Sequence, residues 1–119
     1  MYQRYPEYHT SLDNKEFISF DALGETIETY FDICRILEIN SLYFNKVQHC
    51  EPQLGKRGLY PDSLNPDDAR TELHNLLHLL SYADGKMDLI EIADRRGVCA
   101  LNFAKAISEC TEAGILTQR

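Results

Sequence analysis

Apolar residues recur at helical spacing in several parts of this chain and at no fixed spacing in the segments between them. Over residues 20–40 the apolar positions fall at steps of three and four: Leu23, Ile27, Tyr30, Cys34 and Leu37. Acidic residues fill most of the opposite face, and Ser19 is placed to cap the first turn. This pattern predicts an amphipathic helix of about five turns.

A second helical pattern starts at Asp67 or Asp68, either of which suits a helix cap. Its inward stripe is made of leucines at steps of three, one and three: Leu73, Leu76, Leu77 and Leu80. We expect this helix to end around residues 83–85, with Gly85 in the left-handed closing position.

Two shorter helices and one strand are predicted for the rest of the chain. Asp88 is expected to cap a short helix that stops at Gly97. A longer helix is expected over roughly residues 100–113, with an inward stripe of Leu101, Ala104, Ile107 and Cys110 or Thr111. Gly114 ends it, and residues 115–117 have the apolar and β-branched composition of a strand.

The remaining segments have the composition of loops. Residues 1–18 carry tyrosines at every third position (Tyr2, Tyr5 and Tyr8), a spacing typical of neither helix nor strand. Pro6 prevents a helix across them, so we expect a looped, aromatic segment whose packing neighbours are missing or lie on another chain. Residues 41–66 hold three prolines and two glycines and should form turns and extended pieces.

The predicted elements after residue 66 follow the layout of a winged helix-turn-helix: helix, turn, short helix, turn, longer helix and strand. We therefore expect a mainly α chain: an amphipathic helix with a loop-rich connector, then a small winged-helix-like three-helix unit with minimal β structure. The predicted parts are residues 1–45, a connector over residues 46–66, and the winged-helix unit over residues 67–119.

Composition narrows the classes of partner. The 119 residues carry a net charge of −7, which argues against sequence-independent binding to nucleic acid or to an anionic membrane. No apolar run approaches the roughly 20 residues of a membrane span, and the first residues lack the apolar core of a secretory leader. Four scattered cysteines without a CxxC pair fit a reduced compartment, so we expect a cytoplasmic protein.

Charge also weighs against DNA recognition by the predicted winged helix. Residues 67–119 hold nine acidic and six basic residues, and the expected recognition helix offers Lys105 against Glu109 and Glu112. The sequence also ends after one predicted strand, which leaves no room for a wing hairpin. A protein-docking or oligomer-forming module is therefore expected.

Histidines supply the candidate metal ligands. His9 precedes Asp13 by four residues, and a carboxylate at that distance could orient an imidazole that binds zinc. As a bare pattern this is also what an isolated surface histidine near an acid looks like. His74 and His78 have the spacing of a helical zinc pair, but the pattern lacks the HExxH glutamate, and a surface or partly buried role is expected.

A basic turn, Gly55-Lys56-Arg57-Gly58, interrupts the acidic chain. It lacks the GxxxxGK[ST] pattern of a phosphate-binding loop. Lys56 and Arg57 are candidates to contact an acidic partner surface or a substrate carboxylate, and a solvated turn is the alternative.

Two of these segments resemble a known family. One is residues 7–19, EYHTSLDNKEFIS. This segment resembles the last metal-ligand motif of the M28-type zinc aminopeptidases, in which a His-Thr-x-x-Asp stretch supplies one zinc ligand. YPEYHTSLDN followed by EPQLGKRGLYP is similar to the bacterial DUF4910 (DUF2172-associated) aminopeptidase-like family, whose members end in a winged helix-turn-helix domain. Residues 67–117 resemble that domain as well.

The resemblance implies that the chain is the C-terminal segment of such a protein. Residues 1–45 would be the last loop and helix of the peptidase domain, with His9 as a zinc ligand and Asp13 as its supporting acid. The remaining ligands and the general base would lie upstream, in a peptidase core that is the expected partner, with a homo-oligomer also possible. One histidine cannot hold zinc tightly, so we expect the chain alone to be inactive.

A different class of function stays open from the residues alone. The chain could be a stand-alone winged-helix adaptor or regulatory protein whose N-terminal aromatic residues bind a protein partner. The two hypotheses differ in whether residues 1–18 pack against a peptidase core.

Overall fold

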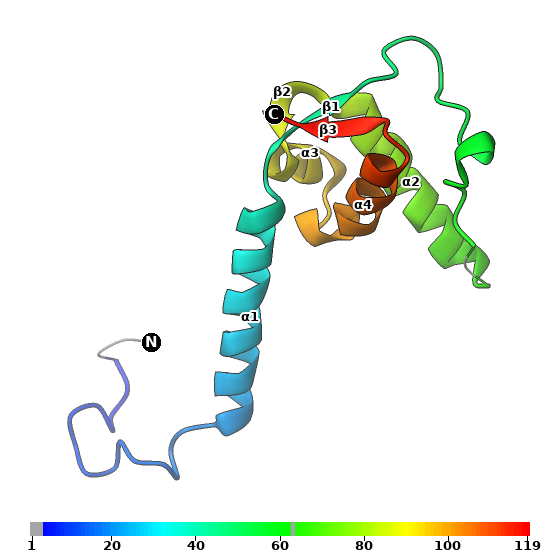
Figure 1. Ribbon diagram of the computed structural model, residues 1–119. Coiled ribbons are helices and arrows are strands. Elements are labelled where there is room, and N and C mark those ends of the chain that lie inside the picture. Colours follow the sequence, from blue (N-terminus) through cyan, green and yellow to red (C-terminus); the bar gives the residue numbers. More distant parts are fainter. Residues whose placement is uncertain (1–3, 63) are drawn as a thin grey trace. The chain divides into compact units, whose positions relative to one another are not determined.

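A computed structural model describes residues 4–62 and 64–119 of the chain, so Tyr2 lies outside the described residues. The chain divides into two compact units, residues 1–34 and 35–119. Figure 1 gives the order of the elements along the chain.

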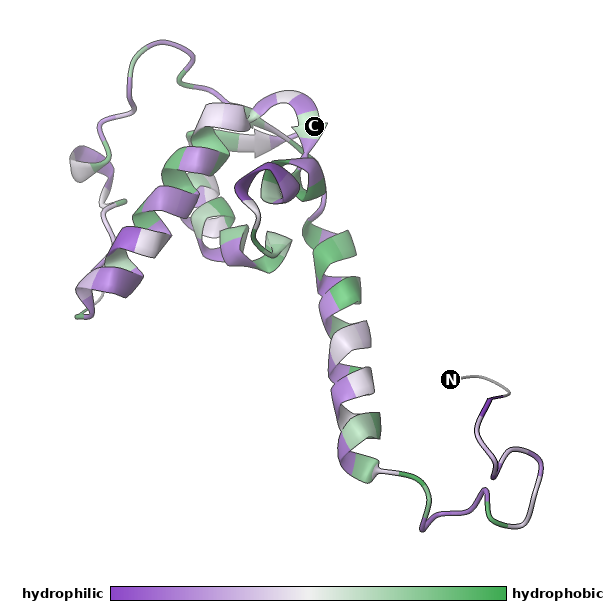
Figure 2. Cartoon of the chain, turned by 180° about the vertical axis from the view of Figure 1, so that it is seen from behind, coloured by the Kyte–Doolittle hydropathy of each residue, from purple (hydrophilic) through white to green (hydrophobic). Residues whose placement is uncertain are grey.

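The predicted amphipathic helix is present as α1 (Phe20–Ile39). The Ser19 hydroxyl accepts a hydrogen bond from the Ala22 N–H at 3.2 Å, as expected of a cap. No residue of α1 is buried, and Figure 2 shows hydrophobic residues along its length. Two apolar side chains near its end, Ile36 and Ile39, pack partly against the core of the C-terminal unit. The other large apolar side chains are 46–71% exposed: Phe20, Leu23, Ile27, Tyr30, Phe31, Ile33 and Leu37. Such a stripe is typical of a surface that packs against another structure.

Helix α2 (Pro66–Tyr82) carries the predicted leucine stripe, but its cap is different. Asn65 has extended backbone, and its side chain accepts from the Asp67 N–H at 3.1 Å, while Pro66 occupies the first helical turn. The prediction of Asp67 or Asp68 as the cap was therefore wrong. Proline lacks the N–H that a first-turn residue leaves unpaired, so the helix extends back to it.

A three-stranded sheet lies in the C-terminal unit, with strand order β2-β1-β3 and antiparallel pairing throughout. The strands are β1 (Leu42–Asn45), β2 (Asp84–Asp88) and β3 (Leu116–Gln118). Of these, the sequence pattern predicted β3. Gly85 has the expected left-handed backbone (φ 78°) but lies within β2, three residues beyond the end of α2. The predicted division into residues 1–45, 46–66 and 67–119 stays a prediction. The sheet combines β1, from the first of these parts, with β2 and β3, from the third.

The short helix α3 (Leu89–Arg96) confirms the predicted Asp88 cap. The Asp88 carboxylate accepts from the Glu91 N–H at 2.9 Å, and the Glu91 carboxylate accepts from the Asp88 N–H at 3.0 Å. This reciprocal pair is a capping box. Gly97 ends the helix with a left-handed backbone, φ 70°.

Replacing Asp88 by alanine is expected to lower the free energy of unfolding by about 1 kcal/mol at pH 7. Hydrogen bonds from the Glu91 N–H and the Asn40 side chain lower the pKa of Asp88. The ionised cap therefore stabilises the fold above about pH 4, and this contribution is lost as the pH falls through the lowered pKa. Urea unfolding of wild type and Asp88→Ala between pH 3 and pH 7 measures the difference.

Asp88→Asn is the matched control for that experiment. Asparagine is as good a helix cap as aspartate, so the free energy of unfolding of Asp88→Asn should stay within a few tenths of a kcal/mol of the wild-type value at pH 7. Unlike aspartate, asparagine does not titrate. An alanine variant that is equally destabilised at pH 3 and pH 7 would contradict the electrostatic part of this account.

The last helical segment starts as a 3₁₀ turn, η2 (Ala100–Phe103), and continues as α4 (Ala104–Glu112). Ala100 is buried at the start of the 3₁₀ turn, and the buried positions that follow it recur at steps of three and four, which is ordinary helical spacing. Phe103, Ala106 and Cys110 are buried, whereas Ala104 is exposed and Leu101 and Ile107 are half-buried. The predicted inward positions were thus right for Cys110 and wrong for Ala104 and for the alternative Thr111.

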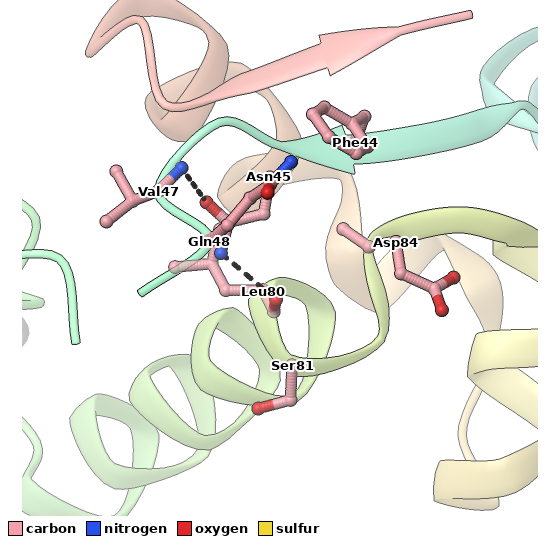
Figure 3. A pocket seen from close by; sticks show the side chains of 8 residues that line it. Phe44, Asn45, Val47, Gln48, Leu80, Ser81 and Asp84 are labelled. Carbon is pink, nitrogen blue, oxygen red and sulfur yellow. Dashed lines mark hydrogen bonds between the residues drawn. The ribbon is translucent and has the colours of Figure 1, made fainter. Parts of the chain in front are cut away.

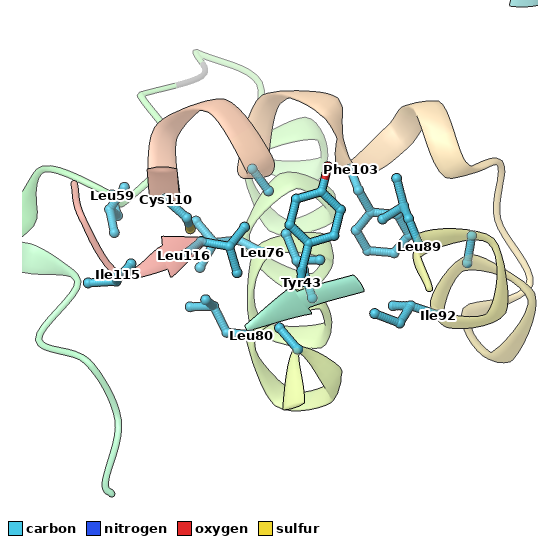
Figure 4. Close-up of a cluster of buried hydrophobic side chains, with 14 of the residues drawn as sticks. Tyr43, Leu59, Leu76, Leu80, Leu89, Ile92, Phe103, Cys110, Ile115 and Leu116 are labelled. Carbon is cyan, nitrogen blue, oxygen red and sulfur yellow. The ribbon is translucent and has the colours of Figure 1, made fainter. Parts of the chain in front are cut away.

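The core of the C-terminal unit is assembled around Tyr43 of β1 (Figure 4). Tyr43 is fully buried, donates its hydroxyl hydrogen to the Ile39 carbonyl at 2.7 Å and accepts from the Gln118 side chain at 3.0 Å. Leucines from α2 and α3, Phe103, Ile115 and Leu116 pack with it. The predicted fold class, mainly α with minimal β structure, is confirmed. Among the described residues, no helix combines the length and the apolar character needed to cross a bilayer.

Candidate functional site

The N-terminal loop is a succession of tight turns. Four backbone hydrogen bonds of 3.0–3.2 Å join residues three apart: Tyr8 to Tyr5, Thr10 to Glu7, Asp13 to Thr10 and Phe17 to Asn14. Aromatic rings pack inside this loop, with Tyr5 stacked on Phe17 at a centroid distance of 5.4 Å. The segment is a loop, as the spacing of its tyrosines predicted, and several of its rings pack on one another within the chain.

His9 occupies a strained position in the loop. Its φ is 60°, one of two positive values among the described non-glycine residues. Its side chain is exposed, and its ring lies 4.1 Å from that of Tyr8. A left-handed backbone at a residue other than glycine costs energy, although histidine adopts it more readily than most, and such residues cluster at functional sites. The backbone thus presents the His9 imidazole at the surface.

Asp13 makes its hydrogen bond to a tyrosine. Its carboxylate accepts from the Tyr5 hydroxyl at 3.1 Å. Partial burial and this neighbouring carboxylate together raise the pKa of Tyr5, so the phenol stays protonated. Sequence reasoning did not connect Tyr5 with Asp13, because an interval of eight residues has no regular meaning in a loop.

A metal ion would need ligands from beyond these residues. The described part of the chain contains no group of three or more His, Cys, Asp or Glu side chains close enough to share a metal ion. An exposed imidazole such as His9 fits the role of one ligand in a zinc site, whereas a complete site takes about four.

The basic turn is a firmly held feature. Lys56 and Arg57 lie in η1 (Gly55–Arg57), a single 3₁₀ turn closed by Gly58 at φ 66°. Leu54 and Leu59, on either side, are 2% and 4% exposed, and the Leu59 N–H donates to the Leu54 carbonyl at 3.1 Å. Because both flanks are anchored in the core, the two cations are presented on a fixed support.

The histidine pair of α2 is divided between surface and interior. His74 is exposed, while His78 is half-buried, with Nε2 3.3 Å from the Ile92 carbonyl and its ring 4.8 Å from Tyr82. His78 therefore helps to join α2 to α3, in agreement with the structural role expected for it.

The exposed side of α4 carries a paired lysine. Lys105 Nζ lies 2.6 Å from a Glu72 carboxylate oxygen and 3.9 Å from one of Glu109. The hydrogen bond to Glu72 raises the pKa of Lys105, which keeps it charged and engaged with acidic neighbours. The side chain is therefore already committed within the chain, on the helix that would read DNA in a winged helix.

Comparison with known families assigns both parts of the chain. Residues 41–118 match a model described as winged helix-turn-helix. The chain belongs to the winged helix-turn-helix family. Residues 1–40 match the model of a domain of unknown function, DUF4910. Both matches confirm the resemblances drawn from the sequence, and the winged-helix match begins one residue before β1.

Two relatives from Clostridium acetobutylicum extend beyond the winged helix. One is named "Putative polysaccharide biosynthesis protein with aminopeptidase-like domain" and is 36% identical over 91 residues, which cover 76% of this chain and 21% of the relative. The other, a crystal structure of a "putative peptidase", is 30% identical with a TM-score of 0.79, covering 97% of this chain and 24% of that one. The chain thus spans about a quarter of the length of these relatives or less.

Proposed function

We propose that the chain is the C-terminal segment of a zinc-dependent, M28-like aminopeptidase, a hydrolase, which contributes one metal-ligand loop and a docking winged helix. The observation that carries this proposal is the likeness of 97% of the chain to part of a peptidase-like chain about four times as long. The strained, exposed His9 supports it, because that residue stands at the ligand position of the resembling motif.

In this proposal His9 gives one imidazole nitrogen to the metal, and Asp13 holds the orientation of that ring. Zinc in such a site supplies Lewis-acid polarisation of the peptide carbonyl. In this 119-residue chain the Asp13 carboxylate accepts from the Tyr5 hydroxyl. In the assembled site it would bond to the His9 imidazole, either in place of Tyr5 or together with it.

The exposed apolar stripe of α1 and the N-terminal aromatic residues are proposed to pack against the peptidase core. Apart from Ile36 and Ile39, the large apolar side chains of α1 are exposed and have room to pack against another surface. Lys56 and Arg57 are proposed to contact an acidic surface or a substrate carboxylate. The winged helix is proposed to dock protein or to oligomerise, since Lys105 is held by Glu72.

The zinc content of a longer protein that carries this segment tests the proposal. We expect that protein to purify with bound zinc and to hydrolyse an aminoacyl p-nitroanilide, while the 119-residue chain does neither. A longer protein that binds no zinc at pH 7.5, even after zinc is added, would overturn the metal assignment.

An immunoblot against residues 67–119 separates this proposal from the adaptor alternative. A band several times heavier than 13.7 kDa in the source cell is expected for a peptidase segment. A band at the mass of the chain would favour a free-standing winged-helix adaptor, which the exposed face of α1 also suits.

A further inference from the structure

A groove lies between the end of α2 and the segment that follows β1 (Figure 3). It consists of two hollows of about 350 and 330 Å³ that share five lining residues: Asn45, Val47, Gln48, Leu80 and Ser81. The first hollow continues to Phe44 and Asp84, and the second continues to Glu51 and Leu77. All of these residues belong to the C-terminal unit.

Asn45 fixes the two walls of the groove against each other. Its side-chain amide donates to the Leu80 carbonyl at 3.2 Å, and its side-chain oxygen accepts from the Val47 N–H at 2.9 Å. Its own N–H donates to the Ala83 carbonyl at 2.7 Å. The groove is thus formed before anything binds, which reduces the entropy cost of binding.

The groove has an apolar floor and a polar rim. Leu80 is buried and Val47 and Leu77 are half-buried, while Gln48 and Ser81 are exposed. A ligand with an aliphatic stem and a polar end matches this division.

The electrostatics of the groove favour a cation. Helix α2 ends in the groove with no basic residue in its last turn, so its carbonyl end, where Leu80 accepts from the neutral Asn45 amide, keeps a partial negative charge that no cation of that turn offsets. At one end of the groove, cations of the chain itself are bound: Lys86 Nζ lies 3.2 Å from Asp84, and the Arg119 guanidinium lies 5.3 Å from the Phe44 ring centre. At the other end, no cation of the described residues forms an ion pair with Glu51.

We propose that this groove is a docking site for a lysine- or arginine-bearing segment of a partner protein. The aliphatic stem of the basic side chain lies on Val47 and Leu77, and its charged end pairs with Glu51 near the carbonyl end of α2. At the Asp84 end of the groove, Lys86 and Arg119 of the chain itself already hold their cations against an acidic and an apolar side chain. The proposed ligand would place a cation in the same way at the Glu51 end. The inference is independent of the proposed metal site.

Titration of the ¹⁵N-labelled 119-residue chain with the peptide acetyl-Leu-Lys-Leu-amide tests this proposal. The amide signals of Val47, Gln48 and Ser81 are expected to shift in a saturable way at low salt. The same peptide with norleucine in place of lysine is expected to bind at least about twofold more weakly, since an exposed ion pair contributes about 0.2–1 kcal/mol.

Glu51→Gln is expected to weaken binding of the lysine peptide about two- to fivefold and to remove its advantage over the norleucine peptide. Glu28→Gln, which removes an equal charge from exposed α1, should bind the lysine peptide as wild type does. The proposal is overturned if the shifts map outside the groove, if both peptides bind equally well, or if the two variants weaken binding equally.

Discussion

Replacing His9 by alanine in a longer, peptidase-like protein is expected to abolish tight zinc binding and peptide hydrolysis together. Loss of the groups that merely orient a metal ligand typically costs 10–100-fold in metal affinity or activity. Loss of a ligand itself should therefore cost more than about 100-fold. Zinc retained after dialysis against a chelator, and the rate of aminoacyl p-nitroanilide hydrolysis, measure the two effects.

His74→Ala is the matched control, because His74 is exposed on α2 and lies outside the proposed site. It should retain both zinc and activity. Asp13→Asn should fall between the two, with a loss of about 10–100-fold, if the carboxylate orients His9. A His9→Ala protein that retains zinc as wild type does would remove His9 from the metal site, whatever its activity.

Replacing Phe103 by alanine is expected to lower the free energy of unfolding by about 3–5 kcal/mol. Phe103 is fully buried at the junction of η2 and α4, with its ring 6.2 Å from that of His78. Removing the ring takes away its apolar burial and leaves a cavity that the rigid junction fills poorly. Urea unfolding of the 119-residue chain, followed by circular dichroism, measures the change.

Leu101→Ala tests the helical phase at this junction. Leu101 is half-buried, so its truncation should cost only about 1–1.5 kcal/mol, which is roughly half the value of full burial. An uninterrupted α-helix over residues 100–113 with Leu101 inward predicts the opposite order of effects. Equal or greater destabilisation by Leu101→Ala would therefore contradict the burial of Phe103, and not Leu101, in the core.

The candidate site could be predicted in part from local sequence. The His9–Asp13 interval and the GKRG turn are short motifs that stand out in one reading of the chain. Two further features depend on the conformation of the successive turns in the loop. They are the hydrogen bond from Tyr5 to Asp13 and the left-handed backbone of His9. No pattern of residue types predicts either feature, since several turn geometries accept the same residues.

The sequence by itself determined the elements whose signals are local. The apolar stripes of α1 and α2, the Ser19 cap and the Asp88–Glu91 capping box depend on neighbours within one or two helical turns. The tertiary structure alone decided the sheet, because β1 pairs with strands more than 35 residues away in the chain. A four-residue strand has little preference of its own until such partners and the surrounding core bury it. The groove beside Asn45 has the same origin, since it forms only where the end of α2 meets the chain leaving β1.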